Sequence, residues 1–113
     1  MLTLPIKKKW FDMIKSGEKK EEYREIKAYY ASRFYSNYIA SGVGLEEYLL
    51  KENANPEVHK EIIFRNGYRK DSPSIECYVR IKKGYGKEKW GAIPGKRYYV
   101  LTILSMRELW FTY

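Results

Sequence analysis

A regular alternation of apolar and polar residues in the second half of the chain constrains the fold most. Between Ser74 and Lys83 every second residue is apolar, at Ile75, Cys77, Val79 and Ile81. The residues between them include Glu76, Tyr78 and Arg80. Because successive side chains of an extended chain point to opposite faces, this segment predicts a strand with one face toward a core.

Four more segments predict strands of the same sheet. They are residues 2–6, 19–26, 60–65 and 98–104. Three of them are rich in β-forming residues, and 19–26 contains neither glycine nor proline. The pair Asn66-Gly67, directly after 60–65, is a turn signal that is typical of hairpins. Short turns between successive strands favour antiparallel pairing.

The helical pattern is clearest in residues 7–16. Ile6, Trp10 and Ile14 recur every four residues, which gives the helix one apolar face. We therefore expect Trp10 to pack in the core. Gly17 follows directly, as expected where a helix ends.

Two other regions are less regular. Residues 28–34 predict a short helix or an aromatic-rich turn, and 36–56 predict a loop with a short helix in its middle. The 113 residues have the length of one domain, and 17% of them are aromatic, which supplies the large side chains that a small core needs. We predict the α+β class: a small, mostly antiparallel β-barrel with two or three short helices. It forms a single domain over 1–113, with an insertion at about 36–58.

The charge is unevenly distributed along the chain. Lys and Arg number 22 against 14 Asp and Glu, a formal net charge of +8. The excess lies in residues 1–35 and 61–113, whereas 36–60 are mildly acidic. If the two basic ends meet in one barrel, their charges converge on one face and attract phosphates. A plain solvated surface, with lysines for solubility, explains the charge equally well.

Cysteine and histidine are scarce. Cys77 and His59 are the single representatives of their types, so neither an internal disulfide nor a cysteine-based metal cage is available, and we expect no metal and no cofactor. No apolar run approaches the roughly 20 residues of a membrane helix. The N-terminus places its apolar residues before its lysines, which reverses the order of a secretory signal. We expect a cytoplasmic protein without membrane contact.

The densest functional pattern lies in residues 17–24. On a strand, Glu22 and Arg24 would share one face, and Lys19 and Tyr23 the other. A lysine just after the glycine turn can project into a groove while Glu22 and Arg24 pair or orient it. Runs rich in lysine and glutamate are, however, usually solvated faces.

Gly17, Lys19, Glu22 and Arg24 spell G-x-K-x-x-E-x-R directly after an amphipathic helix that contains a tryptophan. This pattern resembles the ASCH domain family, whose fold is similar to the PUA β-barrel of RNA-modifying enzymes. The likeness extends over nearly the whole chain, at residues 4–11, 64–68 and 90–91. It implies a PUA-like β-barrel with a basic cleft beside the motif, in which Lys19 and Arg24 face a ligand.

The resemblance implies that this cleft binds RNA or a modified nucleobase. One branch of the family comprises metal-independent amidohydrolases that deacetylate N4-acetylcytidine with a Lys, a Thr and a strand Glu. Lys19 matches that Lys, Glu22 stands at the Thr position, and Glu76 is the nearest candidate for the strand Glu. Other ASCH-like proteins have been proposed as ribonucleases. A small amidohydrolase or a ribonuclease is therefore the alternative function.

Four more side chains complete the expected ligand contacts: Tyr23, Arg33, Arg65 and Trp90. Arg33 stands among tyrosines, which either stack on bases or cap a barrel end. Arg65 flanks the hairpin turn and is either a phosphate contact or a solvated charge. Trp90 lies in a glycine-rich loop and either stacks on a base or anchors that loop on the sheet.

Overall fold

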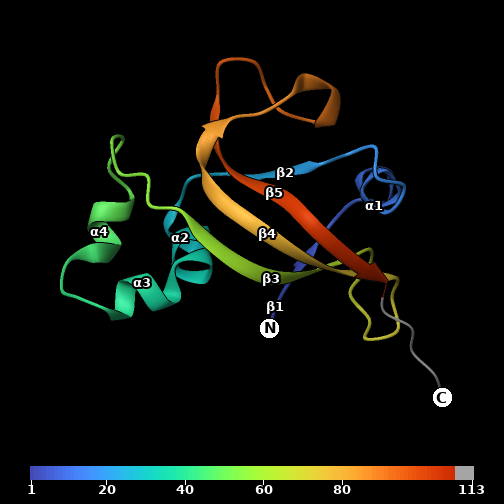
Figure 1. Cartoon of the computed structure of the whole chain (residues 1–113), viewed down its shortest axis with the longest axis horizontal. Helices are drawn as coiled ribbons and strands as arrows, with labels where there is room; N and C mark the ends of the chain where they lie inside the picture. The colour runs from blue at the N-terminus through green and yellow to red at the C-terminus, as the bar shows by residue number, and fades with distance from the viewer. Residues whose placement is uncertain (109–113) are drawn as a thin grey trace.

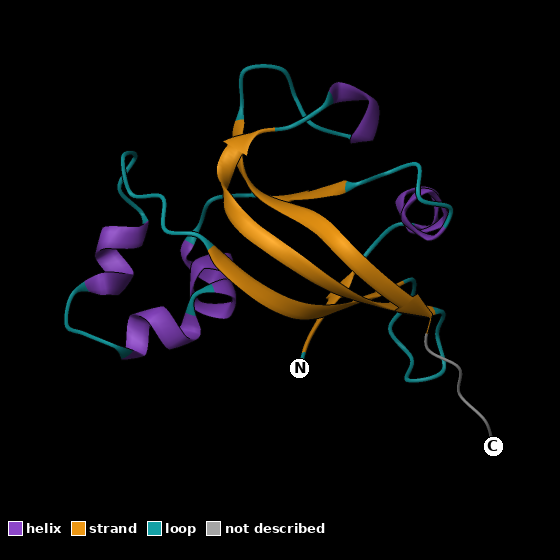
Figure 2. Cartoon of the chain, viewed as in Figure 1, coloured by secondary structure: helices purple, strands orange, loops and turns teal. Residues whose placement is uncertain are grey.

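The computed structural model describes residues 1–108, which form a curled sheet with short helices around it (Figures 1 and 2). The strands are β1 Leu2–Pro5, β2 Glu21–Arg24, β3 Val58–Arg65, β4 Ser74–Tyr85 and β5 Arg97–Glu108. The helices are α1 Lys8–Lys15, α2 Ala28–Phe34, α3 Ser36–Ala40 and α4 Leu45–Leu49, with a 3-10 turn, η1, at Glu88–Trp90.

The sheet has the strand order β1-β3-β4-β5-β2. β1 runs parallel to β3, and the other three neighbouring pairs are antiparallel. The strands curl into a half-barrel (Figure 1). The predicted α+β class with a mostly antiparallel sheet is confirmed. The described residues contain four α-helices, one more than the upper number expected.

The alternation in β4 has the predicted effect. Ile75, Cys77, Val79 and Ile81 are buried with at most 1% of their surface exposed, whereas Tyr78 is exposed. A register shift between Tyr78 and Val79 bends the strand at its middle. This strand lies at the centre of the sheet, between β3 and β5.

Aromatic side chains fill much of the core, as the composition indicates. The ring of Tyr99, which is fully buried on β5, lies 5.7 Å from that of Phe34 and 5.6 Å from that of Tyr35. Edge-to-face and tilted contacts of this kind add to the free energy of burial. The helices that follow β2 therefore pack on the sheet through large rings at one end of the molecule, and α1 lies at the other (Figure 1).

The end of α1 fixes where the motif begins. Gly17 has a φ of +85°, a conformation that favours glycine, and its N–H donates to the carbonyl of Ile14 at 3.0 Å. The N–H of Lys19 donates to the carbonyl of Met13 at 2.9 Å. These bonds close the helix and turn the chain back. β2 starts only at Glu21, later than the predicted strand over 19–26.

Two connections differ from expectation. The region 36–56 contains two short helices, α3 and α4, instead of one. The Asn66-Gly67 turn signal begins a longer connection, residues 66–73, between β3 and β4. Among the described helices, none is both long and apolar enough to cross a membrane.

Candidate functional site

A cleft of about 490 Å³ opens at the β2 edge of the sheet, where the chain before α1, β2 and η1 meet. Its walls come from segments far apart in the sequence. They are Pro5, Ile6, Lys7, Trp10, Glu22, Tyr23, Arg24, Glu25, Trp90, Gly91 and Tyr98. The motif residues Glu22 and Arg24 are therefore part of the cleft, together with Tyr23.

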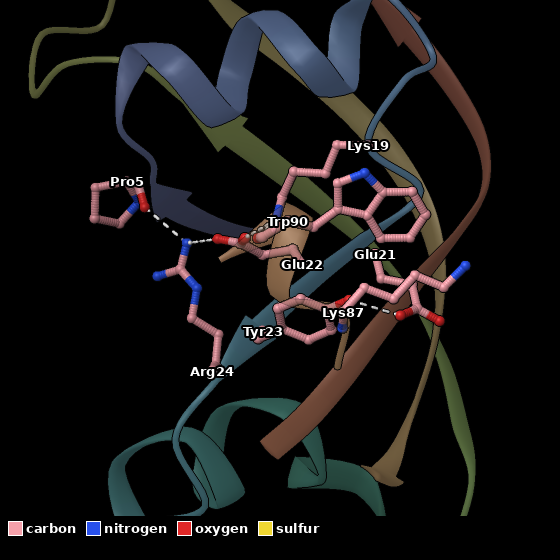
Figure 3. Close-up of polar contacts among 8 residues, drawn as sticks. All are labelled: Pro5, Lys19, Glu21, Glu22, Tyr23, Arg24, Lys87 and Trp90. Carbon is pink, nitrogen blue, oxygen red and sulfur yellow. Dashed lines mark hydrogen bonds and ion pairs between the residues drawn. The ribbon is translucent and has the colours of Figure 1, made fainter. Parts of the chain in front are cut away.

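Aromatic rings make up much of the wall. Trp10 is half-buried, while Trp90 and Tyr98 have 5% and 7% of their surface exposed. The ring of Tyr23 lies 5.6 Å from that of Tyr98. The N–H of Lys87 donates to the Tyr23 hydroxyl at 2.8 Å. This hydroxyl in turn donates to the carboxylate of Glu21 (Figure 3).

Two glycines allow these rings to pack. A Cβ at Gly86 would lie 2.5 Å from the ring of Tyr23, closer than any real contact. A Cβ at Gly91 would lie 3.0 Å from the ring of Trp10, and its φ of +102° also favours glycine. The loop over 86–91 can therefore pack against the rings of Tyr23 and Trp10 only because residues 86 and 91 have no side chain.

Lys19 lies behind the cleft wall, with 1% of its surface exposed. Its ammonium donates to the carbonyl of Trp90 and lies 3.3 Å from Oε1 of Glu22. The centres of the Trp10 and Tyr23 rings lie 4.6 and 5.0 Å from this ammonium. Burial lowers the pKa of Lys19 below its ordinary value, and the Glu22 carboxylate opposes this effect.

Glu22 is held between two cations. Nη2 of Arg24 donates to Oε2 of Glu22 at 2.8 Å and to the carbonyl of Pro5 at 2.8 Å (Figure 3). Nη1 of Arg24 lies 3.3 Å from the hydroxyl of Tyr30. Both terminal nitrogens of Arg24 therefore have hydrogen-bond partners within the protein, and the guanidinium holds the wall of the cleft in place.

The motif was predicted in part. Glu22 and Arg24 share a face and pair, as the strand pattern indicates. Lys19 reaches Glu22 although alternation would place the two on opposite faces, because residue 19 precedes β2. The interpretation of this run as a solvated face is wrong for Lys19 and Glu22, which have 1% and 6% of their surface exposed.

Lysines surround the aromatic wall. The ammonium of Lys9 lies 4.6 Å from the centre of the Trp10 ring. Those of Lys87 and Lys89 each lie 4.8 Å from the Trp90 ring, and that of Lys96 lies 5.3 Å from the Tyr98 ring. Cations from both basic segments of the sequence thus lie next to rings of the cleft wall. These lysines were not among the predicted site residues, although a lysine next to a tryptophan, at 9–10 and 89–90, was a signal for them.

The two tryptophans that line the cleft, Trp10 and Trp90, differ from expectation in how accessible they are. Trp10 packs against the core but also lines the cleft. Trp90 is buried and anchors η1, which agrees with the loop-anchor alternative. Trp10, which was expected only in the core, is therefore the more accessible of the two rings.

Four predicted site residues do not line the cleft: Lys19, which is buried behind its wall and does not face a ligand as expected, and Glu76, Arg33 and Arg65. Glu76 accepts a bond of 2.5 Å from Arg107 and lines a separate cavity of about 250 Å³. Arg33 lies on α2, 3.5 Å over the ring of Tyr29. Arg65 donates to Ser74 at 3.2 Å. The candidate catalytic set of Lys19, Glu22 and Glu76 is therefore not assembled in one cavity, because Glu76 faces outward from the central strand β4.

Across residues 1–108, no group of three or more His, Cys, Asp or Glu side chains is arranged to hold a metal ion. Cys77 is buried, and burial raises its pKa to about 12, which leaves its thiol unreactive. The ionisable groups of the cleft are thus carboxylates, lysines, tyrosines and an arginine.

No family model, no curated protein and no solved structure matches this chain. Function is therefore inferred from the cleft and from the motif that builds it.

Proposed function

We propose that this chain binds RNA, or a modified nucleobase, in the cleft beside the G-x-K-x-x-E-x-R motif. One observation carries the proposal: three aromatic side chains of the wall, Trp10, Trp90 and Tyr98, each have a lysine ammonium within 5.3 Å. Trp10, the more accessible of the two tryptophan rings, can stack on a base, and the lysines next to the three rings can bind the phosphates of the same strand. The resemblance to the ASCH family supports the same function.

A carboxylate gives the cleft a means to orient the base. Each oxygen of Glu22 accepts one bond from the protein, from Lys19 or from Arg24, and an ionised carboxylate has about four lone-pair sites. The remaining sites can accept from the amino group of a base. The two cations hold the carboxylate in one geometry, so it is preorganised for this contact.

In this proposal Lys19 and Arg24 act as positioning residues. The ammonium of Lys19 is enclosed by protein groups, and both terminal nitrogens of Arg24 have protein partners. The contact of Lys19 with Trp90 holds η1 beside β2, and the bond of Arg24 to Pro5 holds the segment before α1 beside β2. Substituting either residue therefore tests stability together with affinity, and a surface residue gives the cleaner experiment.

Lys9 and its neighbour Lys8 offer a matched pair. Both are exposed at the start of α1, but Lys9 lies over Trp10, whereas Lys8 pairs with Asp12 at 2.6 Å. We expect Lys9→Gln to weaken the binding of a fluorescein-labelled RNA octamer several-fold, measured by fluorescence anisotropy at several salt concentrations. The log–log salt slope should fall by about 0.7 for one lost phosphate contact.

Lys8→Gln is the control, because it removes the same charge from the same helix. Equal losses for the two variants would mean that binding is purely electrostatic and does not use the cleft. Absence of saturable binding by the wild type would contradict the proposal.

The alternative is hydrolysis of an N-acylated pyrimidine nucleoside or of RNA. The lowered pKa of Lys19 next to the Glu22 carboxylate is the observation that favours it, because a neutral amine can act as a base. Prolonged incubation of concentrated enzyme with N4-acetylcytidine, and with end-labelled RNA, tests it. Turnover by the wild type that is lost in Glu22→Gln, under conditions in which circular dichroism shows this variant still folded, would establish the enzyme, and unchanged substrates would exclude these two reactions.

A further inference from the structure

A second cavity adjoins the cleft. It has a volume of about 290 Å³ and is lined by Pro5, Ile6, Lys7, Gly67 and Tyr68. Pro5, Ile6 and Lys7 also line the cleft. The two cavities therefore share residues 5–7 as a common wall, and the two cavities together with this wall are here called the extended groove.

The shared wall is fixed on both sides. The carbonyl of Pro5 accepts from Arg24 at 2.8 Å. The N–H of Ile6 donates to the carbonyl of Arg65 at 2.9 Å, and the side-chain amide of Asn66 donates to the carbonyl of Ile6 at 3.0 Å. The distance between the cleft and the loop at 66–73 is thus set by hydrogen bonds to a single short segment.

Tyr68 has 93% of its surface exposed, although the loop that carries it is well structured. The N–H of Asn66 donates to the carbonyl of Pro73 at 2.9 Å, and the N–H of Arg69 donates to Oγ of Ser72 at 3.1 Å. The loop closes tightly, since a Cβ at position 67 would lie 2.4 Å from that oxygen. A structured loop therefore presents an aromatic ring to solvent.

The groups around Tyr68 are mainly cationic. Arg69 and Lys70 follow Tyr68 in the sequence and are exposed. Arg69 forms an ion pair with Asp71, at 3.4 Å. Lys7 is the charged residue that both cavities have in common, and its side chain is exposed. A single exposed ring among cations suits a stacked base with flanking phosphates better than it suits an apolar peptide.

We propose that the extended groove binds a single strand of RNA over at least two successive nucleotides. One base occupies the cleft, its neighbour stacks on Tyr68, and Lys7 contacts the phosphate between them. This inference rests on the proposed function and deepens it, because it identifies the ligand as a polynucleotide strand instead of a free nucleoside.

The experiment compares a short ligand with a long one. Dissociation constants are measured for cytidine 5′-monophosphate, by NMR chemical-shift titration, and for a mixed-sequence RNA octamer, by fluorescence anisotropy. Tyr68→Ala should weaken octamer binding by about 5- to 150-fold, the range for one stacked base, and leave the mononucleotide unaffected. Lys7→Gln should weaken octamer binding several-fold and reduce its salt slope.

Two variants serve as matched controls. Tyr48→Ala removes an exposed tyrosine from α4, which lies at the opposite end of the molecule from α1 (Figure 1), and Lys8→Gln removes a lysine next to Lys7. Both should bind the octamer as the wild type does.

Each failure has a distinct signature. If Tyr68→Ala binds the octamer as tightly as the wild type, or the wild type binds octamer and mononucleotide equally well, the extended groove is wrong while the cleft proposal stands. If the wild type binds neither ligand, both proposals are wrong.

Discussion

Two buried lysines, Lys19 and Lys83, show how different surroundings give one residue type two roles. They have 1% and 4% of their surface exposed. Lys19 faces a carboxylate, two aromatic rings and a carbonyl at the edge of the cleft. The ammonium of Lys83 donates to the carbonyls of Leu49 at 2.7 Å and Lys51 at 2.9 Å. The first assembles the candidate site, and the second ties α4 to the sheet.

The charged neighbours of the two lysines have opposite effects on their pKa values. Burial lowers the pKa of both lysines. At Lys19 the Glu22 carboxylate counteracts burial, whereas at Lys83 the positive charge of Arg97 lowers the pKa further. A charge that is balanced by a carboxylate can be retained beside a ligand site, while carbonyl dipoles suffice for a structural anchor.

The largest expected effect comes from removing the carboxylate. Glu22→Gln leaves the ammonium of Lys19 and the guanidinium of Arg24 without their shared anion. Loss of one partner of a buried ion pair costs about 3–5 kcal/mol in the free energy of unfolding. Urea denaturation followed by circular dichroism measures this cost.

Glu25→Gln is the control for this substitution, because Glu25 is exposed and its ion pairs are 3.7 Å or longer. It should change stability by less than about 0.5 kcal/mol. A similarly small change in Glu22→Gln would mean that Lys19 does not need the carboxylate, and the contrast with Lys83 would disappear.

A smaller loss of stability is expected when Lys83 is replaced. Lys83→Met keeps most of the side-chain volume but leaves the carbonyls of Leu49 and Lys51 without their donor, at a cost of about 1–3 kcal/mol. Hydrogen exchange should also become faster in α4. Lys82→Met changes the exposed neighbour and should have little effect. Equal stabilities of the two variants would show that Lys83 is not an anchor.

The smallest expected effect concerns pH. Because the folded chain holds the proton of Lys83 more weakly than the unfolded chain, the unfolded chain binds more protons between the lowered pKa and the ordinary value of 10.5. Wild-type stability relative to Lys83→Met should therefore rise with pH through this window. Buried tyrosines with raised pKa values, such as Tyr35, are common to both proteins and cancel. A difference independent of pH would mean that Lys83 titrates normally.

Periodicity predicted the elements that build the scaffold. The alternation at 74–83 gave a central strand, and the four-residue spacing around Trp10 gave α1 with its end at Gly17. These patterns are local, since each depends only on which face of one element meets the core. The loop at 66–73 and the second helix in 36–56 were missed because their composition is typical of any turn-rich segment.

Local patterns in the sequence were enough to predict the strands, the first helix and the motif from Gly17 to Arg24. Which charged residues of that motif are buried, and which predicted partners they meet, depends on how distant segments pack together. Lys19 and Glu22 are buried because α1 and η1 close over the edge strand β2, and Glu76 is excluded because β4 directs it to another cavity. Burial of a charge depends on what packs over it from distant segments, and no local pattern contains that information.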